Sequence, residues 1–160
     1  INTHGVQPAA DRLALLRWAC FQVFIGNTDA HGKNLSFFVH PSGVSLAPAY
    51  DMVCIPALED PQLSGTLAMA VGDSFIDNEI SPFDWAQLGH QAGLRPAAMA
   101  RQMNRLIEKL DTALPKARQH ALASGVNADV IDSITRHVAQ ACEKHRTAAQ
   151  QVKSVDPDLL

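Results

Sequence analysis

An aspartate, an asparagine and a second aspartate stand in an order that suits phosphoryl transfer. Asp29 is followed five residues later by Asn34, and Asp51 comes after two short apolar runs that a Pro/Gly turn separates. In this chemistry one carboxylate orients an attacking hydroxyl and accepts its proton. An amide oxygen and a second carboxylate hold the Mg²⁺ that bridges the nucleotide phosphates. The pattern makes Asp29 a candidate base, and Asn34 and Asp51 candidate Mg²⁺ ligands.

The same loop carries further candidates, and its spacing matches that of a known catalytic loop. The interval from Asp29 to Asn34 equals the interval between the catalytic aspartate and the metal-binding asparagine of protein kinases. His31 either orients the loop by a hydrogen bond, which we favour, or contacts a substrate. Lys33 either neutralises a phosphate or is a solvated loop lysine, and Asn27 is expected to fix the loop backbone. The plainer alternative is that the acidic and amide groups only bond their own backbone in turns.

The elements around this loop are expected to hold it in place. Residues 8–25 form a helix that is apolar on most sides and ends near Gly26, which is typical of a buried central helix. Two short strands, at 35–39 and 44–46, are joined by a turn at 40–43. A hairpin of this length brings Asp51 back beside Asn34.

The second half of the chain is predicted to be helical. Residues 53–80 are the least regular part, with one strand at 66–71, and could fold over the site as a loop. A capping box begins a helix at Ser81, and Gly93 stops it. Further helices are expected at 96–114, at 115–124, and from a cap at Asn127 or Asp129, before a frayed tail at 153–160. The fold class is therefore mainly α, a helical bundle with a small β-hairpin at the active-site cleft.

Composition and charge limit the alternatives. The 160 residues fit one domain of ordinary globular composition, and the first residue, Ile1, indicates a fragment of a longer protein. The net charge of −3, with scattered basic residues, disfavours a nucleic-acid surface. Three widely spaced cysteines indicate neither zinc nor a disulfide framework and fit a reducing cytoplasm. No apolar run is long enough for a membrane helix, and none reads as a signal peptide.

The motifs narrow the class of protein by resemblance. The run GNTDAHGKN at 26–34 and the run LAPAYDM at 46–52 resemble the HipA-like toxin kinase family, and LAMAVG at 67–72 resembles its next strand. The resemblance covers residues 8–93, and beyond them only the helical character matches. It implies the larger, protein-kinase-like lobe of a bacterial serine/threonine kinase. By that likeness Asp29 is the catalytic base, and Asn34 and Asp51 bind Mg²⁺ with ATP.

The resemblance also implies partners for the protein. The sequence departs from the family's pattern in several features. Family substrates are aminoacyl-tRNA synthetases, and a helix-turn-helix antitoxin restrains the kinase and carries the DNA-binding role. The family's smaller N-terminal lobe supplies a glycine-rich loop, a nucleotide-pairing lysine and an autophosphorylated serine, none of which occurs here. We therefore expect residues 1–160 to be a C-terminal lobe that is inactive alone. Met52 and Val53 replace the Phe and Gly of the common kinase tripeptide, so a flip of that segment cannot be assumed.

Two other functions stay open from the sequence. A small-molecule phosphotransferase of the same superfamily can use the same Asp-x-His-x-x-Asn loop. A non-catalytic pseudokinase that binds an antitoxin-like partner would fit the missing nucleotide lobe, although an intact set of Asp29, Asn34 and Asp51 argues against decay of the site.

Overall fold

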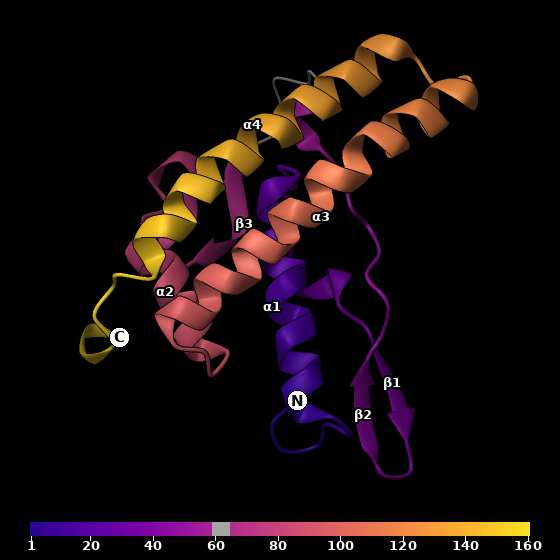
Figure 1. The fold of residues 1–160 in the computed structure, drawn as a ribbon. Helices are drawn as coiled ribbons and strands as arrows, with labels where there is room; N and C mark the ends of the chain where they lie inside the picture. The colour runs from indigo at the N-terminus through magenta and orange to yellow at the C-terminus, as the bar shows by residue number, and fades with distance from the viewer. Residues whose placement is uncertain (59–64) are drawn as a thin grey trace.

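The computed structural model describes residues 1–58 and 65–160 and is mainly helical (Figure 1). The α-helices are α1 (Pro8–Phe24), α2 (Pro82–Gln91), α3 (Pro96–Ala123) and α4 (Ala128–Val152). The strands are β1 (Phe37–His40), β2 (Gly43–Leu46), β3 (Thr66–Val71) and β4 (Ser74–Ile76). Short 3-10 turns lie at Gly32–Asn34, Ile55–Ala57, Asp77–Glu79 and Pro157–Leu159. Part of the irregular segment predicted at 53–80 lies outside the described residues.

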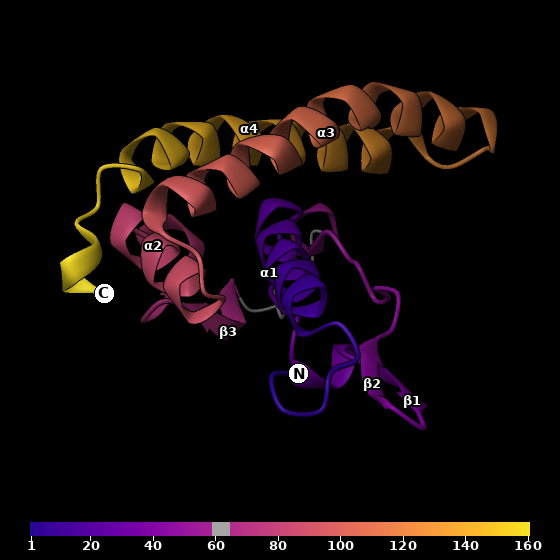
Figure 2. The same ribbon diagram turned by 60° about the horizontal axis from the view of Figure 1, so that its bottom comes forward.

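Helix α1 is the central element, as its sequence predicted. It lies beneath the long α3 and α4 helices, with α2 on one side and the β1–β2 hairpin on the other (Figure 2). Its apolar residues join α2, α3 and α4 in one core that includes Phe24, Trp85, Met99 and Met103, all fully buried. The end of α1 is therefore a rigid platform for the loop that follows it.

Helices α3 and α4 form a long antiparallel hairpin whose tip projects beyond the rest of the molecule (Figure 1). The prediction of two helices divided at Pro115 was wrong, because α3 runs unbroken from Pro96 to Ala123 with Pro115 inside it. A proline removes one helical hydrogen bond and crowds the preceding turn. Packing along α4, with ion pairs between Arg118 and Asp132 and between Arg146 and Asp111, outweighs that local preference.

The strands make two separate antiparallel pairs, β1–β2 and β3–β4. In the first pair the register joins Phe37 to Leu46 and His40 to Gly43, so the turn is two residues shorter than predicted. The N-terminal segment adds to β2, because the Val44 N–H donates to the His4 carbonyl at 2.7 Å. Strand β3 has the predicted bounds, whereas the sequence analysis missed β4, which pairs with it.

The predicted helix boundaries in the second half are mostly confirmed. At the start of α2 the Ser81 hydroxyl accepts from the Asp84 N–H, and the Asp84 carboxylate accepts from the Ser81 N–H, which is the capping box. Asn127 caps α4 by accepting from the Asp129 N–H at 2.7 Å. The predicted tail is partly ordered as the short turn at Pro157–Leu159. Among the described residues, no helix is both long and apolar enough to cross a membrane.

Candidate functional site

The candidate loop begins where α1 ends and is folded by its own short-range hydrogen bonds. Gly26 adopts a left-handed φ of 73° and turns the chain out of the helix. The loop then closes into the 3-10 turn Gly32–Asn34, with the Asn34 N–H donating to the His31 carbonyl. The buried Asn34 accepts from the His31 N–H at 2.8 Å through Oδ1. This contact fixes which way the Asn34 amide faces.

The β1–β2 hairpin brings Asp51 to this amide, as the spacing of the sequence suggested. The Asn34 Nδ2 group donates to Asp51 Oδ2 in a short hydrogen bond. The two side chains are therefore close enough to bind one small ligand together. Asp51 has a φ of 57°, and it is the single non-glycine residue with positive φ in the described part of the chain. This conformation is uncommon for residues other than glycine, and Asp is one of the residues that adopt it more readily.

Two other residues secure the segment that carries Asp51. The Tyr50 hydroxyl donates to the Lys33 carbonyl at 2.8 Å and lies 3.0 Å from the Ser36 hydroxyl. The Asn27 side chain donates to the Asp51 carbonyl at 2.9 Å. The segment is thus tied to both ends of the candidate loop.

Asp29 lies on the exposed side of the loop. Within the described residues its carboxylate makes no hydrogen bond or ion pair, so it does not serve as a turn cap. The backbone beside it is supported from β3, because the Ala68 N–H donates to the Thr28 carbonyl at 2.8 Å. The carboxylate is available to a hydroxyl that approaches from solvent.

His31 and Lys33 occupy different surroundings. The His31 ring is half-buried, and its Nδ1 atom has no hydrogen-bond partner in the described structure. Its backbone, rather than its ring, makes the contact that orients Asn34. Lys33 is exposed and forms no ion pair with any described residue, so its ammonium group is free to meet an anion.

The donor set at Asn34 and Asp51 fits Mg²⁺. Both side chains offer oxygen atoms, and a Mg²⁺ site that uses one or two protein ligands takes the rest from water and substrate phosphates. The Asn34 Oδ1 atom keeps a second lone pair beside the one that accepts from His31. Among the described residues, no three or more His, Cys, Asp or Glu side chains are grouped so that they could hold a metal ion.

A cavity of about 530 Å³ opens beside Asn34. The hairpin and α1 line it, including Trp18, Phe38 and Leu46, together with the segment that leads to Asp51. A cavity of this size is in the range that holds small ligands. Of the two candidate metal ligands, Asn34 lines this cavity and Asp51 does not.

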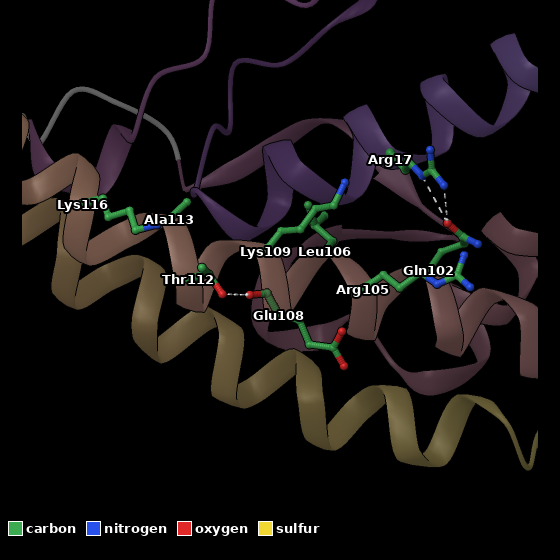
Figure 3. Close-up of a pocket in the computed structure, with 9 residues that line it drawn as sticks. All are labelled: Arg17, Gln102, Arg105, Leu106, Glu108, Lys109, Thr112, Ala113 and Lys116. Carbon is green, nitrogen blue, oxygen red and sulfur yellow. Dashed lines mark hydrogen bonds between the residues drawn. The ribbon is translucent and has the colours of Figure 1, made fainter.

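A second and larger hollow, of about 650 Å³, lies elsewhere, between α1 and α3. Figure 3 shows its lining, in which the Arg17 guanidinium donates to Gln102 and the side chains of Arg105 and Lys109 extend from α3. Neither Asp29, Asn34 nor Asp51 lines it, so we do not assign it to the candidate reaction.

Two contributors to this site, Gln22 and Tyr50, were not predicted from the sequence. Gln22 is a buried amide near the end of α1, and Tyr50 ties the Asp51 segment to the loop. The signal for Gln22 was a polar residue within the otherwise apolar run of residues 18–24 at the end of α1. The tyrosine had no such signal, because its partners are a backbone carbonyl and a hydroxyl distant in sequence.

Comparisons with known proteins agree on one family. The model of the HipA-like C-terminal domain matches residues 1–117, so the chain belongs to this family. The serine/threonine-protein kinase toxin HipA of Shewanella oneidensis is 30% identical over 93% of this chain and 34% of its own length. A solved complex of Shewanella oneidensis HipA with HipB and operator DNA has a chain that is 27% identical, with a TM-score of 0.78 over 92% of this chain and 36% of that one.

The chain is therefore similar to a toxin of a toxin–antitoxin system that is named as a kinase, and its fold agrees with a solved HipA structure. It spans about a third of the length of these relatives. The resemblance seen in the motifs is confirmed at the level of the family.

Proposed function

We propose that this chain is the C-terminal catalytic lobe of a HipA-like serine/threonine kinase, the toxin of a bacterial toxin–antitoxin system. The observation that carries the proposal is the contact between the Asn34 amide and the Asp51 carboxylate, in the same loop system as the unpaired Asp29. The reaction is Mg-ATP-dependent transfer of a phosphoryl group to a protein hydroxyl. The lobe is of the protein-kinase type, and the nucleotide-binding lobe comes from the rest of the enzyme.

In the proposed mechanism the protein contributes position and charge. The exposed Asp29 carboxylate accepts a hydrogen bond from the substrate hydroxyl and then its proton. Asn34 and Asp51 are the residues that would hold Mg²⁺, and the ion would neutralise charge on the ATP phosphates. His31 fixes the Asn34 amide through its backbone N–H, and Lys33 is placed to meet a phosphate oxygen. Most of the rate gain in such a site comes from orientation and electrostatics.

The proposed partners follow from the same family. The substrate is a protein, with an aminoacyl-tRNA synthetase as the family's example, and the regulator is a helix-turn-helix antitoxin. The solved relative contains HipB and operator DNA, and in our proposal DNA is reached only through the antitoxin. The proposed location is the cytoplasm.

The test is phosphate transfer from radiolabelled ATP by the complete gene product, with an Asp29→Asn variant. We expect transfer to require Mg²⁺ and to fall by about 10²–10⁴-fold in the variant, which is the usual contribution of a general base. Asp73→Asn is the matched control, because Asp73 is exposed at the β3–β4 turn, and it should retain full activity.

Other results would contradict the proposed function or favour one of its alternatives. Transfer that survives Asp29→Asn at the wild-type rate would exclude Asp29 as the base. Transfer to a small metabolite but to no protein would indicate the phosphotransferase alternative. A folded wild-type protein without any transfer would favour a binding module.

A further inference from the structure

We propose that the buried amide pair Gln22–Asn27 is a positioning device that aims Asp51 at its ligand. The inference rests on the proposed function, because it gives the pair a task at the Mg²⁺ site. Neither residue touches the reacting groups, so both act through Asp51.

The pair reaches Asp51 through a continuous set of hydrogen bonds. Asn27 Nδ2 donates to the Gln22 Oε1 atom at 2.9 Å and to the Asp51 carbonyl at 2.9 Å. The Asn27 backbone N–H donates to the Gln22 carbonyl at 2.8 Å. Asn27 is therefore held by α1 at both its backbone and its side chain. Its side chain in turn restrains the backbone of Asp51.

Asp51 needs such a hold because its backbone is unfavourable. Its φ of 57° lies in the left-handed region, which non-glycine residues adopt only rarely, although Asp does so more often than most. The residue is also exposed, so core packing does not fix it. Its carbonyl is held by Asn27 and its carboxylate by Asn34. With both ends fixed, the carboxylate keeps one direction relative to Asn34.

The burial of the pair argues against a role in stability alone. Gln22 and Asn27 are 2% and 3% exposed, and the Gln22 Nε2 atom has no hydrogen-bond partner among the described residues. Leaving a buried amide group without a hydrogen-bond partner is unfavourable, because the group loses its bonds to water. An apolar residue at position 22, beside the buried Val23 and Phe24, would avoid this penalty. The Gln22 side chain is nevertheless an amide, and its oxygen accepts from the same Asn27 Nδ2 group that donates to the Asp51 carbonyl.

The first measurement is the Mg²⁺ concentration that gives half-maximal phosphate transfer by the complete gene product. Asn27→Ala should raise it by about 10–100-fold, the usual effect of losing a group that orients a metal ligand, with the KM for the protein substrate unchanged. Gln22→Met, which keeps Asn27 and removes only its support, should raise it by less. Asn104→Ala on α3, a partly exposed amide outside the site, should leave it unchanged.

The second measurement does not depend on activity. The backbone ¹⁵N order parameters of residues 50–53, measured by NMR relaxation, should fall below about 0.6 in Asn27→Ala, while those of α3 and α4 stay at the wild-type values. Lower order parameters throughout the protein would mean a general loss of structure and would overturn the positioning role, as would an unchanged Mg²⁺ requirement in an active variant. If the wild type transfers no phosphate, the proposed function fails, and the order parameters of residues 50–53 still decide whether Asn27 holds Asp51.

Discussion

At the residue scale, Gly26 controls how the candidate loop leaves α1. Its φ is 73°, and a Cβ placed on it would lie 2.4 Å from the His137 Nε2 atom and 2.9 Å from the Pro56 Cδ atom. Both the backbone conformation and the space around it exclude a side chain. The next residue, Asn27, is the one that holds Asp51. A change at Gly26 therefore acts on both stability and site geometry.

We expect Gly26→Ala to lower the free energy of unfolding by about 1–3 kcal/mol, because alanine is strained at this φ and must displace the His137 ring. Urea denaturation of the variant and the wild type measures this difference in the free energy of unfolding. Gly32→Ala is the matched control in the same loop, since a Cβ there meets nothing within 4 Å. Its effect should stay within about 0.5 kcal/mol. Equal losses in the two variants would show that Gly26 is not specially constrained.

At the element scale, α3 shows that packing outweighs a local break signal. Pro115 lies in the interior of the helix, where it removes a backbone hydrogen bond. The helix continues because its partner α4 lies alongside and the pair is joined by ion pairs across the hairpin. Pro115 should therefore destabilise α3 without breaking it.

Replacing Pro115 by alanine should stabilise the protein by about 1–3 kcal/mol, because it restores a helical N–H and removes the steric conflict. The midpoint of urea unfolding at constant slope reports the gain. Lys116→Ala, an exposed change in the same turn, should leave the midpoint almost unchanged. A less stable Pro115→Ala variant would show that the proline ring makes a packing contribution of its own.

At the scale of the whole molecule, one polar cluster joins distant parts of the chain. The fully buried His145 of α4 stacks on Phe24 of α1 at 4.5 Å and meets the Trp85 ring of α2 at 5.3 Å. Its Nε2 atom lies 3.5 Å from the Asp77 carboxylate, which Lys144 also contacts at 2.6 Å. The cluster ties both ends of the core to the turn after β4.

The ionisable groups of this cluster make stability depend on pH. Burial lowers the pKa of His145 below its ordinary value of 6.5, although Asp77 acts in the opposite sense. Burial raises the pKa of the Asp77 carboxyl, but the neighbouring His145 and Lys144 outweigh it and lower that pKa to about 2. Both groups bind fewer protons when folded than when unfolded, so stability falls on acidification. The His145 contribution is lost as the pH falls below 6.5, and that of Asp77 as the pH falls from about 4 towards 2.

We expect the free energy of unfolding to decrease between pH 7.5 and 5.5, and His145→Phe to flatten this decrease. Burial also lowers the pKa of His137, so part of the slope should remain. Urea unfolding at several pH values measures it, with His120→Phe on exposed α3 surface as the control. A variant with the wild-type slope would contradict the role of His145, whatever its absolute stability.

Local sequence determined much of this protein. The bounds of α1 and β3 and the caps at Ser81 and Asn127 depend on residues only a few positions apart. Side-chain caps and apolar periodicity act over that range. Membership of the HipA-like family was visible in the short motifs at 26–34 and 46–52, and the family model confirms it. The roles of the site residues stay predictions.

Tertiary structure alone decided the rest. The addition of the N-terminal segment to β2 and the unbroken α3 depend on neighbours that the chain supplies from elsewhere. The left-handed backbone of Asp51 and its hold by Asn27 span 24 positions of sequence. No local propensity encodes such contacts, because their free energy exists only once the helices and hairpins have packed together.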